Sequence, residues 1–223
     1  MEQSIDVGST LPARIAEDMI RMMKRHEINN GERLREETFV KKYNVSQTVV
    51  REAFFILESR DFVKRIPRRG VYLDLPSKEE MPKILKVREV NEIFVNREFA
   101  LNHTEEQIAT VESHVATAQK KIENNDYSTY LRYGKLLHSV VYDFAGYPKL
   151  KRMYENIQDV IDIYYANESG PDSVMHDEHI EMDDHWKIFF ALKAGDADGV
   201  EEAIRTHLEH VSERLSHNIY NKQ

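Results

Sequence analysis

A short polar segment at positions 46–51 has residue types and spacing suited to hydrogen bonding with DNA. Ser46, Gln47 and Thr48 are small or polar, and Arg51 follows one helical turn after Gln47. At the start of a helix, such residues leave backbone N–H groups free to bind phosphate. The Gln47 amide suits the edge of adenine, and the Arg51 guanidinium suits the edge of guanine. The segment therefore predicts a helix N-terminus that reads base edges.

The surrounding elements are expected to hold this segment in a small helical domain. Ser46 is a favourable N-cap for a helix over 47–60, and apolar residues along that helix give it a side for packing. An earlier helix is expected to begin near Pro12 and to end before the Asn-Asn-Gly run at 29–31. A second helix is expected over 36–42, so the polar segment opens the third helix.

A basic hairpin is expected after the third helix. The hydrophobic period changes there, and 62–66 and 71–75 have the composition of two short strands. The turn between them holds Arg68, Arg69 and Gly70, so its tip would bring two cations to the DNA backbone or minor groove. Glycine would allow a close turn at that point. Three helices followed by a basic hairpin predict a winged helix-turn-helix.

Charge is divided unevenly along the chain. Residues 1–75 hold 14 Lys and Arg against 12 Asp and Glu, whereas the whole chain has 31 against 39 and a net charge of −8. This division is typical of an anion-binding module attached to an acidic domain, although a solvated charged surface would give the same counts. The net charge excludes a uniformly basic coat for nucleic acid.

Composition excludes several other classes. The 223 residues, of which 41% are hydrophobic, are enough for one small and one medium folded domain. The chain has no Cys, which excludes disulfides, thiolate metal sites, iron–sulfur clusters and cysteine nucleophiles. No signal peptide or long apolar run is present, so we expect a soluble cytoplasmic protein with no membrane partner.

Three motifs occur together in the N-terminal part. They are Gly-Glu-Arg-Leu-Arg-Glu at 31–36, Val-Ser-Gln-Thr-Val-Val-Arg-Glu-Ala at 45–53 and Arg-Gly-Val-Tyr-Leu at 69–73. The combination resembles the signature of the GntR superfamily of bacterial transcription regulators. This resemblance implies binding to double-stranded DNA through Arg35, Ser46, Gln47, Thr48, Arg51, Arg68, Arg69 and Gly70. The family usually has Arg at 47 and Pro at 49, where this chain has Gln47 and Val49, so the family's usual operator is not carried over.

The rest of the chain is expected to be entirely helical. Breaker residues separate six predicted helices, over 79–102, 105–124, 127–145, 148–167, 174–194 and 197–221. The predicted fold is therefore mainly α: a winged helix-turn-helix in 1–75, a hinge at 76–80 and an all-α six-helix bundle in 81–223. A bundle of this size can enclose a ligand cavity.

Short motifs in this helical part occur in a fixed order. They are the segment 88–92, Leu-His at 137–138 before Gly-Tyr-Pro at 146–148, His185 before Ala-Gly-Asp at 194–196, and His-Leu at 207–208. They resemble the FCD effector domain of the FadR-type branch, in its shorter VanR-like subgroup. The resemblance implies a small carboxylate effector. It also implies that Arg88 pairs with that carboxylate, for which its bidentate fork is suited; the alternative is a surface ion pair with Glu92.

The same resemblance implies a divalent metal inside the bundle. Many FCD domains hold it with three His and one Asp, and the histidines correspond to His138, His185 and His207. The Asp would stand one helical turn before His138, where this chain has Gly134. Imidazoles from three helices suit Zn, Ni or Mn, with water or an effector carboxylate completing the site. The alternative is that the histidines only line a pocket.

These features favour a ligand-responsive transcription regulator that acts as a repressor. It would be a homodimer, because one winged helix reads a half-site and a two-fold dimer reads a palindromic operator. The alternatives are a metal-dependent, hydrolase-like enzyme that uses the three histidines, and a helical scaffold. The enzyme does not account for the N-terminal module. Replacing Arg51 by Ala would cost a regulator about 1–3 kcal/mol of operator binding and leave its fold intact.

Overall fold

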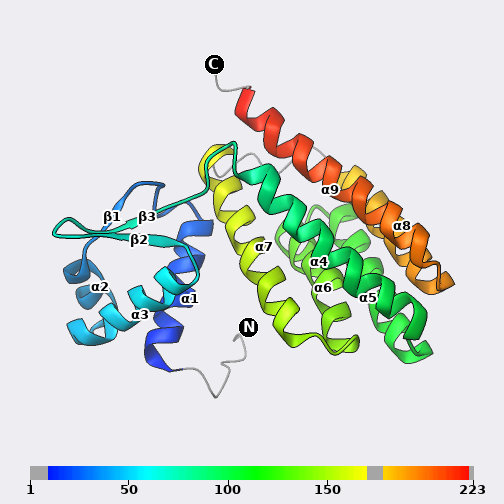
Figure 1. Cartoon of the computed structure of the whole chain (residues 1–223), viewed down its shortest axis with the longest axis horizontal. Coiled ribbons are helices and arrows are strands. Elements are labelled where there is room, and N and C mark those ends of the chain that lie inside the picture. The colour runs from blue at the N-terminus through cyan, green and yellow to red at the C-terminus, as the bar shows by residue number, and fades with distance from the viewer. Residues whose placement is uncertain (1–9, 170–177, 221–223) are drawn as a thin grey trace. The chain divides into compact units, whose positions relative to one another are not determined.

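The computed structural model describes residues 10–169 and 178–220 (Figure 1). Contacts divide the chain into two compact units, one of Met1–Ser77 and Asp159–Asp172, the other of Lys78–Gln158 and Ser173–Gln223. The described residues are mostly helical with one small sheet, so the predicted mainly α class is confirmed. None of the described helices has both the length and the apolarity required to cross a membrane.

The first unit contains α1 (Leu11–Lys24), α2 (Glu36–Tyr43) and α3 (Gln47–Ser59). The Ser46 hydroxyl oxygen accepts a hydrogen bond from the Val49 N–H at 3.5 Å, which confirms the predicted N-cap of α3. Helix α1 packs against α3. The buried side chains between the helices include Ile15, Met19, Met23, Phe39, Val50, Phe54 and Leu57. This apolar core leaves the polar N-terminus of α3 outside.

The sheet consists of β1 (Arg33–Leu34), β2 (Val63–Ile66) and β3 (Gly70–Leu73), in the order β1-β3-β2 with antiparallel pairing. The predicted hairpin is confirmed, with Val63 opposite Leu73. Strand β1 was not predicted, because two residues are too few to show an alternating pattern. It pairs with β3 and widens the hairpin into a small sheet.

The six predicted helices of the second part are also present in the described residues. They are α4 (Met81–Asn102), α5 (Glu105–Glu123), α6 (Tyr127–Phe144), α7 (Pro148–Ser169), α8 (Glu178–Ala194) and α9 (Ala197–Tyr220). Their bounds follow the breaker residues used to predict them. The predicted start of the fifth helix, 174–177, lies outside the described residues.

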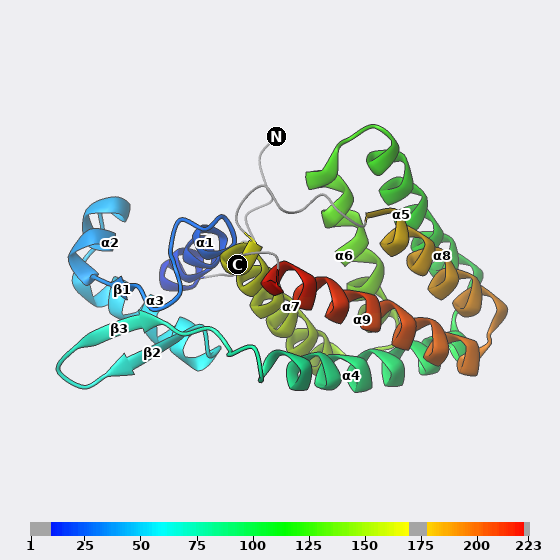
Figure 2. The ribbon, with the colours of Figure 1, turned by 90° about the horizontal axis from the view of Figure 1, so that it is seen from above.

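Helix α9 lies between α4 and α8, and α5 packs on both α6 and α8 (Figure 2). The interior of this bundle is mainly apolar, but among the described residues it also contains eight that are buried and polar or charged: Arg88, Asn91, Glu92, Asn96, His138, Asp184, His185 and His207. Burying such groups is costly unless each finds a partner. Their concentration in one bundle therefore directs attention to this interior.

Candidate functional site

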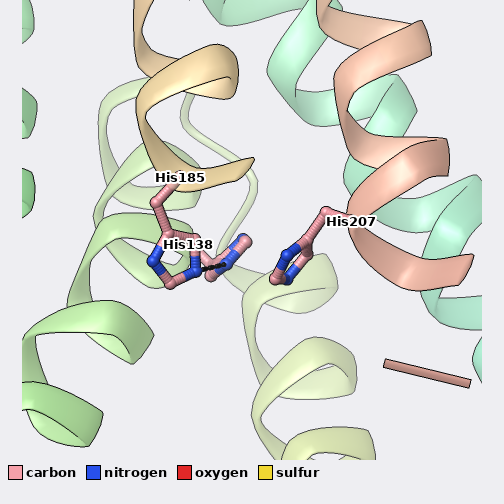
Figure 3. A group of neighbouring side chains, drawn as sticks. All are labelled: His138, His185 and His207. Carbon is pink, nitrogen blue, oxygen red and sulfur yellow. Dashed lines mark hydrogen bonds between the residues drawn. The ribbon is translucent and has the colours of Figure 1, made fainter. Parts of the chain in front are cut away.

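Three histidines from three helices converge inside the bundle, with their rings pointing toward one another (Figure 3). His138 lies on α6, His185 on α8 and His207 on α9, and all three are buried. One ring nitrogen from each lies within 4.8 Å of the others. The Nε2 atoms of His138 and His185 are 3.3 Å apart. The three positions implied by the family resemblance are thus brought together.

Each histidine takes a place on the inward face of its helix that an apolar residue would otherwise fill. Its neighbours three or four positions away are buried: Val141 and Tyr142 for His138, Met182 and Ile188 for His185, and Ile204 and Val211 for His207. Such spacing puts side chains on one helical face. The surrounding apolar side chains therefore fix the orientation of the rings.

Burial favours the neutral form of His185 and of His207. Desolvation, together with the neighbouring His138, lowers the pKa of His185 to about 4. Desolvation and the two other histidines hold the pKa of His207 well below its usual value. The Nδ1 atoms of both residues are buried, and neither has a hydrogen-bond partner among the described residues. Imidazole nitrogens that lie this close together inside the bundle are suitable ligands for a divalent metal.

A carboxylate orients the third histidine. Oε2 of Glu92 lies 2.8 Å from Nδ1 of His138. Burial of Glu92 raises the pKa of its carboxyl, but the Arg88 charge and His138 outweigh this effect and lower it to about 2. The ionised carboxylate can only accept, so Nδ1 of His138 donates, and Nε2 is the nitrogen that faces His185. This arrangement is typical of a metal-ligating histidine. Sequence reasoning did not predict this role for Glu92.

Arg88 forms a buried ion pair with Glu92. Its Nε donates to Oε1 of Glu92 at 2.5 Å, and its guanidinium carbon lies 5.5 Å from the centre of the Tyr154 ring. Arg88 is 4% exposed and Glu92 0%. The predicted alternative of an ion pair with Glu92 is correct in its partner but wrong in placing the pair at the surface. The pairing of Arg88 with an effector stays a prediction.

Gly134 faces the histidine cluster. A Cβ atom at this position would lie 3.2 Å from Cε1 of His185. A side chain at 134 would thus project toward the cluster, where the family places its carboxylate ligand. Among the described residues, the group that could hold a metal ion consists of the three histidines and includes no carboxylate. The residues present fit a three-nitrogen site with further coordination positions left for other ligands.

The predicted DNA-binding residues lie mostly on the surface of the first unit. Arg35, Ser46, Gln47, Thr48, Arg51, Arg68 and Arg69 are exposed, and Gly70 is half-buried. Nε of Arg51 donates to both Glu36 oxygens at 3.0 and 2.9 Å, and Nε2 of Gln47 donates to Oε2 of Glu36 at 2.5 Å. Sequence reasoning missed Glu36, because this contact joins two helices.

The hairpin turn depends on a glycine. Gly70 has φ +115°, a region that favours glycine, and a Cβ atom there would lie 2.9 Å from Nε of Arg33. Arg68 also adopts a left-handed conformation, with φ 62°. This backbone places Arg68 and Arg69 at the tip between β2 and β3, where the sequence predicted them.

Comparisons with known proteins match both units. The family described as bacterial regulatory proteins, gntR family, matches residues 11–73, and the FCD domain matches residues 83–210. The HTH-type transcriptional repressor RspR of Escherichia coli (strain K12) is 26% identical over 189 residues, which cover 83% of this chain and 80% of that protein. The uncharacterized HTH-type transcriptional regulator YdhC of Bacillus subtilis (strain 168) is 23% identical over 192 residues, covering 84% and 83%. The solved structure of E. coli McbR/YncC has the same fold, with a TM-score of 0.78 at 18% identity over 94% of this chain and 98% of that chain.

Proposed function

We propose that this chain, which belongs to the gntR family of bacterial regulatory proteins and carries an FCD domain, represses transcription in response to a small organic acid. Proteins of this family regulate transcription and are not enzymes, so the alternative of a three-histidine hydrolase is set aside. The similarity to RspR, a transcriptional repressor, supports the direction of the regulation. A regulator of bacterial DNA would act in the cytoplasm.

The proposal assigns a task to each part of the chain. Residues 1–75 bind double-stranded DNA, with α3 entering the major groove and the β2–β3 tip contacting the backbone or minor groove. Residues 76–80 are the hinge, and residues 81–223 bind the effector and form the dimer. Effector binding would weaken operator binding by a coupling free energy of about 1–3 kcal/mol.

The charges around the histidine cluster support an anionic effector. Each nearby carboxylate already has a partner in the protein: Glu92 pairs with Arg88, Glu181 with Arg214, and Asp184 with His210 and Lys187. The imidazole side chains of the cluster add no negative charge. A divalent ion such as Zn, Ni or Mn, held by His138, His185 and His207, would therefore bring an uncompensated charge into a buried site, which is unfavourable. A carboxylate effector would offset part of that charge, so metal and effector would favour each other's binding.

Helix α4 supports a homodimer. Val87, Val90 and Phe94 follow helical spacing and are exposed, Val90 by 62%. A row of large apolar side chains facing solvent marks an interaction surface. We assign a second copy of this chain to it, because a palindromic operator needs two recognition helices related by a two-fold axis.

The observation that carries the proposal is the convergence of three buried histidines inside a domain attached to a winged helix-turn-helix. The test is selection of genomic fragments on the purified full-length protein, with and without Zn²⁺, followed by sequencing. We expect enrichment of a near-palindrome, and neighbouring genes would nominate the effector. The Arg51→Ala variant is the control and should lose the enrichment. Absence of any enriched sequence with the wild-type protein would refute the proposal.

A further inference from the structure

The two residues predicted to read bases share one carboxylate. Glu36, at the start of α2, accepts from Nε of Arg51 through both of its oxygens and from Nε2 of Gln47. Arg51 is 55% exposed, whereas Glu36 is 23% exposed. The carboxylate is thus the better buried partner, fixed to α2, and it ties two exposed side chains of α3 to a neighbouring helix.

The bonding pattern leaves the groups that read bases available. Glu36 engages Arg51 through Nε alone, and the two Nη groups form the fork that pairs with O6 and N7 of guanine. Glu36 takes one N–H of the Gln47 amide, which leaves the second N–H and the carbonyl oxygen for adenine. A long side chain normally loses rotamer freedom when it binds, and a side chain already held in one conformation loses less.

We propose that Glu36 is a positioning residue for base recognition: it holds Arg51 and Gln47 in one arrangement and thereby sets the operator specificity of the protein. This inference rests on the proposed function, since it concerns the same recognition helix. Glu36 would act through the two readers and would not itself touch a base. An exposed ion pair of this kind adds little to stability, so its role lies in recognition.

A purely electrostatic role makes a different prediction. A negative charge near DNA repels phosphates whatever the sequence, so its removal raises affinity for all duplexes equally. Glu37 provides the matched control. It is exposed, carries the same charge in the same first turn of α2, and is not hydrogen-bonded to Arg51 or Gln47.

The experiment compares full-length wild type, Glu36→Ala and Glu37→Ala. The probes are the duplex that wild type enriches from genomic fragments and a scrambled duplex of equal length, at one fixed salt concentration. We expect Glu36→Ala to lower the ratio of the two affinities by about fivefold or more, the worth of one bidentate base contact, while Glu37→Ala leaves the ratio unchanged. Circular dichroism melting checks that both variants fold as wild type does. An equal rise in both affinities for Glu36→Ala would overturn the inference.

Selection from a randomised operator separates positioning from direct reading. We expect Glu36→Ala to relax preference at the same base positions that Arg51→Ala and Gln47→Ala relax. Relaxation at a position that neither variant affects would mean that Glu36 reads a base itself, and would overturn the positioning role. If wild type enriches no sequence at all, the proposed function fails as well, so the two failures are distinguishable.

Discussion

Breaking the buried Arg88–Glu92 pair should destabilise the helical unit strongly, and by different amounts from the two sides. Both side chains are almost fully buried and bonded at 2.5 Å. Removing one partner from such a pair leaves an uncompensated buried charge, at a cost of about 3–5 kcal/mol. Arg88 cannot shed its proton, so Glu92→Leu should lie at the upper end of this range. Glu92 can take up a proton when its partner is lost, so Arg88→Met should lie at the lower end.

The double variant supplies the internal control. In Arg88→Met/Glu92→Leu both charges are gone, and two apolar side chains of similar size fill the space. Replacement of a whole buried pair by apolar residues is often close to neutral. His138 loses its hydrogen-bond acceptor in this variant, which should cost about 1–3 kcal/mol. We therefore expect the double variant to be more stable than Glu92→Leu alone.

Urea unfolding followed by tryptophan fluorescence measures these differences in the right part of the molecule. Trp186 is the single tryptophan of the chain and lies on α8, against Phe189 and Phe190. A probe placed in one unit is needed because a chain with two units need not unfold in one step. A chelator keeps bound metal from adding to stability. A loss below about 1 kcal/mol in Glu92→Leu would refute the reasoning, because Arg88 would then not be an isolated buried charge.

Three further outcomes follow from the same structure. Gly134→Asp should raise the affinity for Ni²⁺, measured by calorimetry without added carboxylate, by about tenfold or more, because it adds a carboxylate at the site. Gly134→Ala crowds His185 equally and should not raise the affinity, so an equal gain in both variants would contradict the idea that position 134 lacks a ligand. The pKa of His185 is about 4 in the folded state and 6.5 in the unfolded state, so the unfolded state binds more protons between these pH values. The free energy of unfolding should therefore fall by about 1 kcal/mol from pH 7.5 to 5.5, and a flat profile would show that His185 is not buried in its neutral form. Phe94→Glu should yield a monomer in sedimentation at concentrations where Phe190→Glu, exposed on α8, remains a dimer; the reverse result would move the dimer surface to α8.

The sequence was sufficient to predict elements whose signals are local. The helix bounds followed from breakers and from caps such as Ser46, whose hydroxyl indeed caps α3. Strand β1 was out of reach, because its two residues are defined only by their pairing with β3. The helical spacing of Arg88 and Glu92 predicted that they could pair, but spacing cannot tell a buried face from an exposed one. The convergence of the histidines could be expected only through the family resemblance, since positions 138, 185 and 207 lie on separate helices.

Glu36 and Glu92 illustrate how burial determines the effect of losing a pair between a carboxylate and an arginine. Each carboxylate accepts a hydrogen bond from the Nε of an arginine and from a second side chain, Gln47 in one case and His138 in the other. At the surface, water screens the pair, so its loss should leave stability nearly unchanged and appear as lost discrimination between DNA sequences. In the bundle, no water replaces a missing partner, so loss should first appear as unfolding. Glu36→Ala should therefore change discrimination between DNA sequences, and Glu92→Leu should change the free energy of unfolding. A Glu36→Ala protein that unfolds as readily as Glu92→Leu would show that burial does not separate a role in recognition from a role in stability.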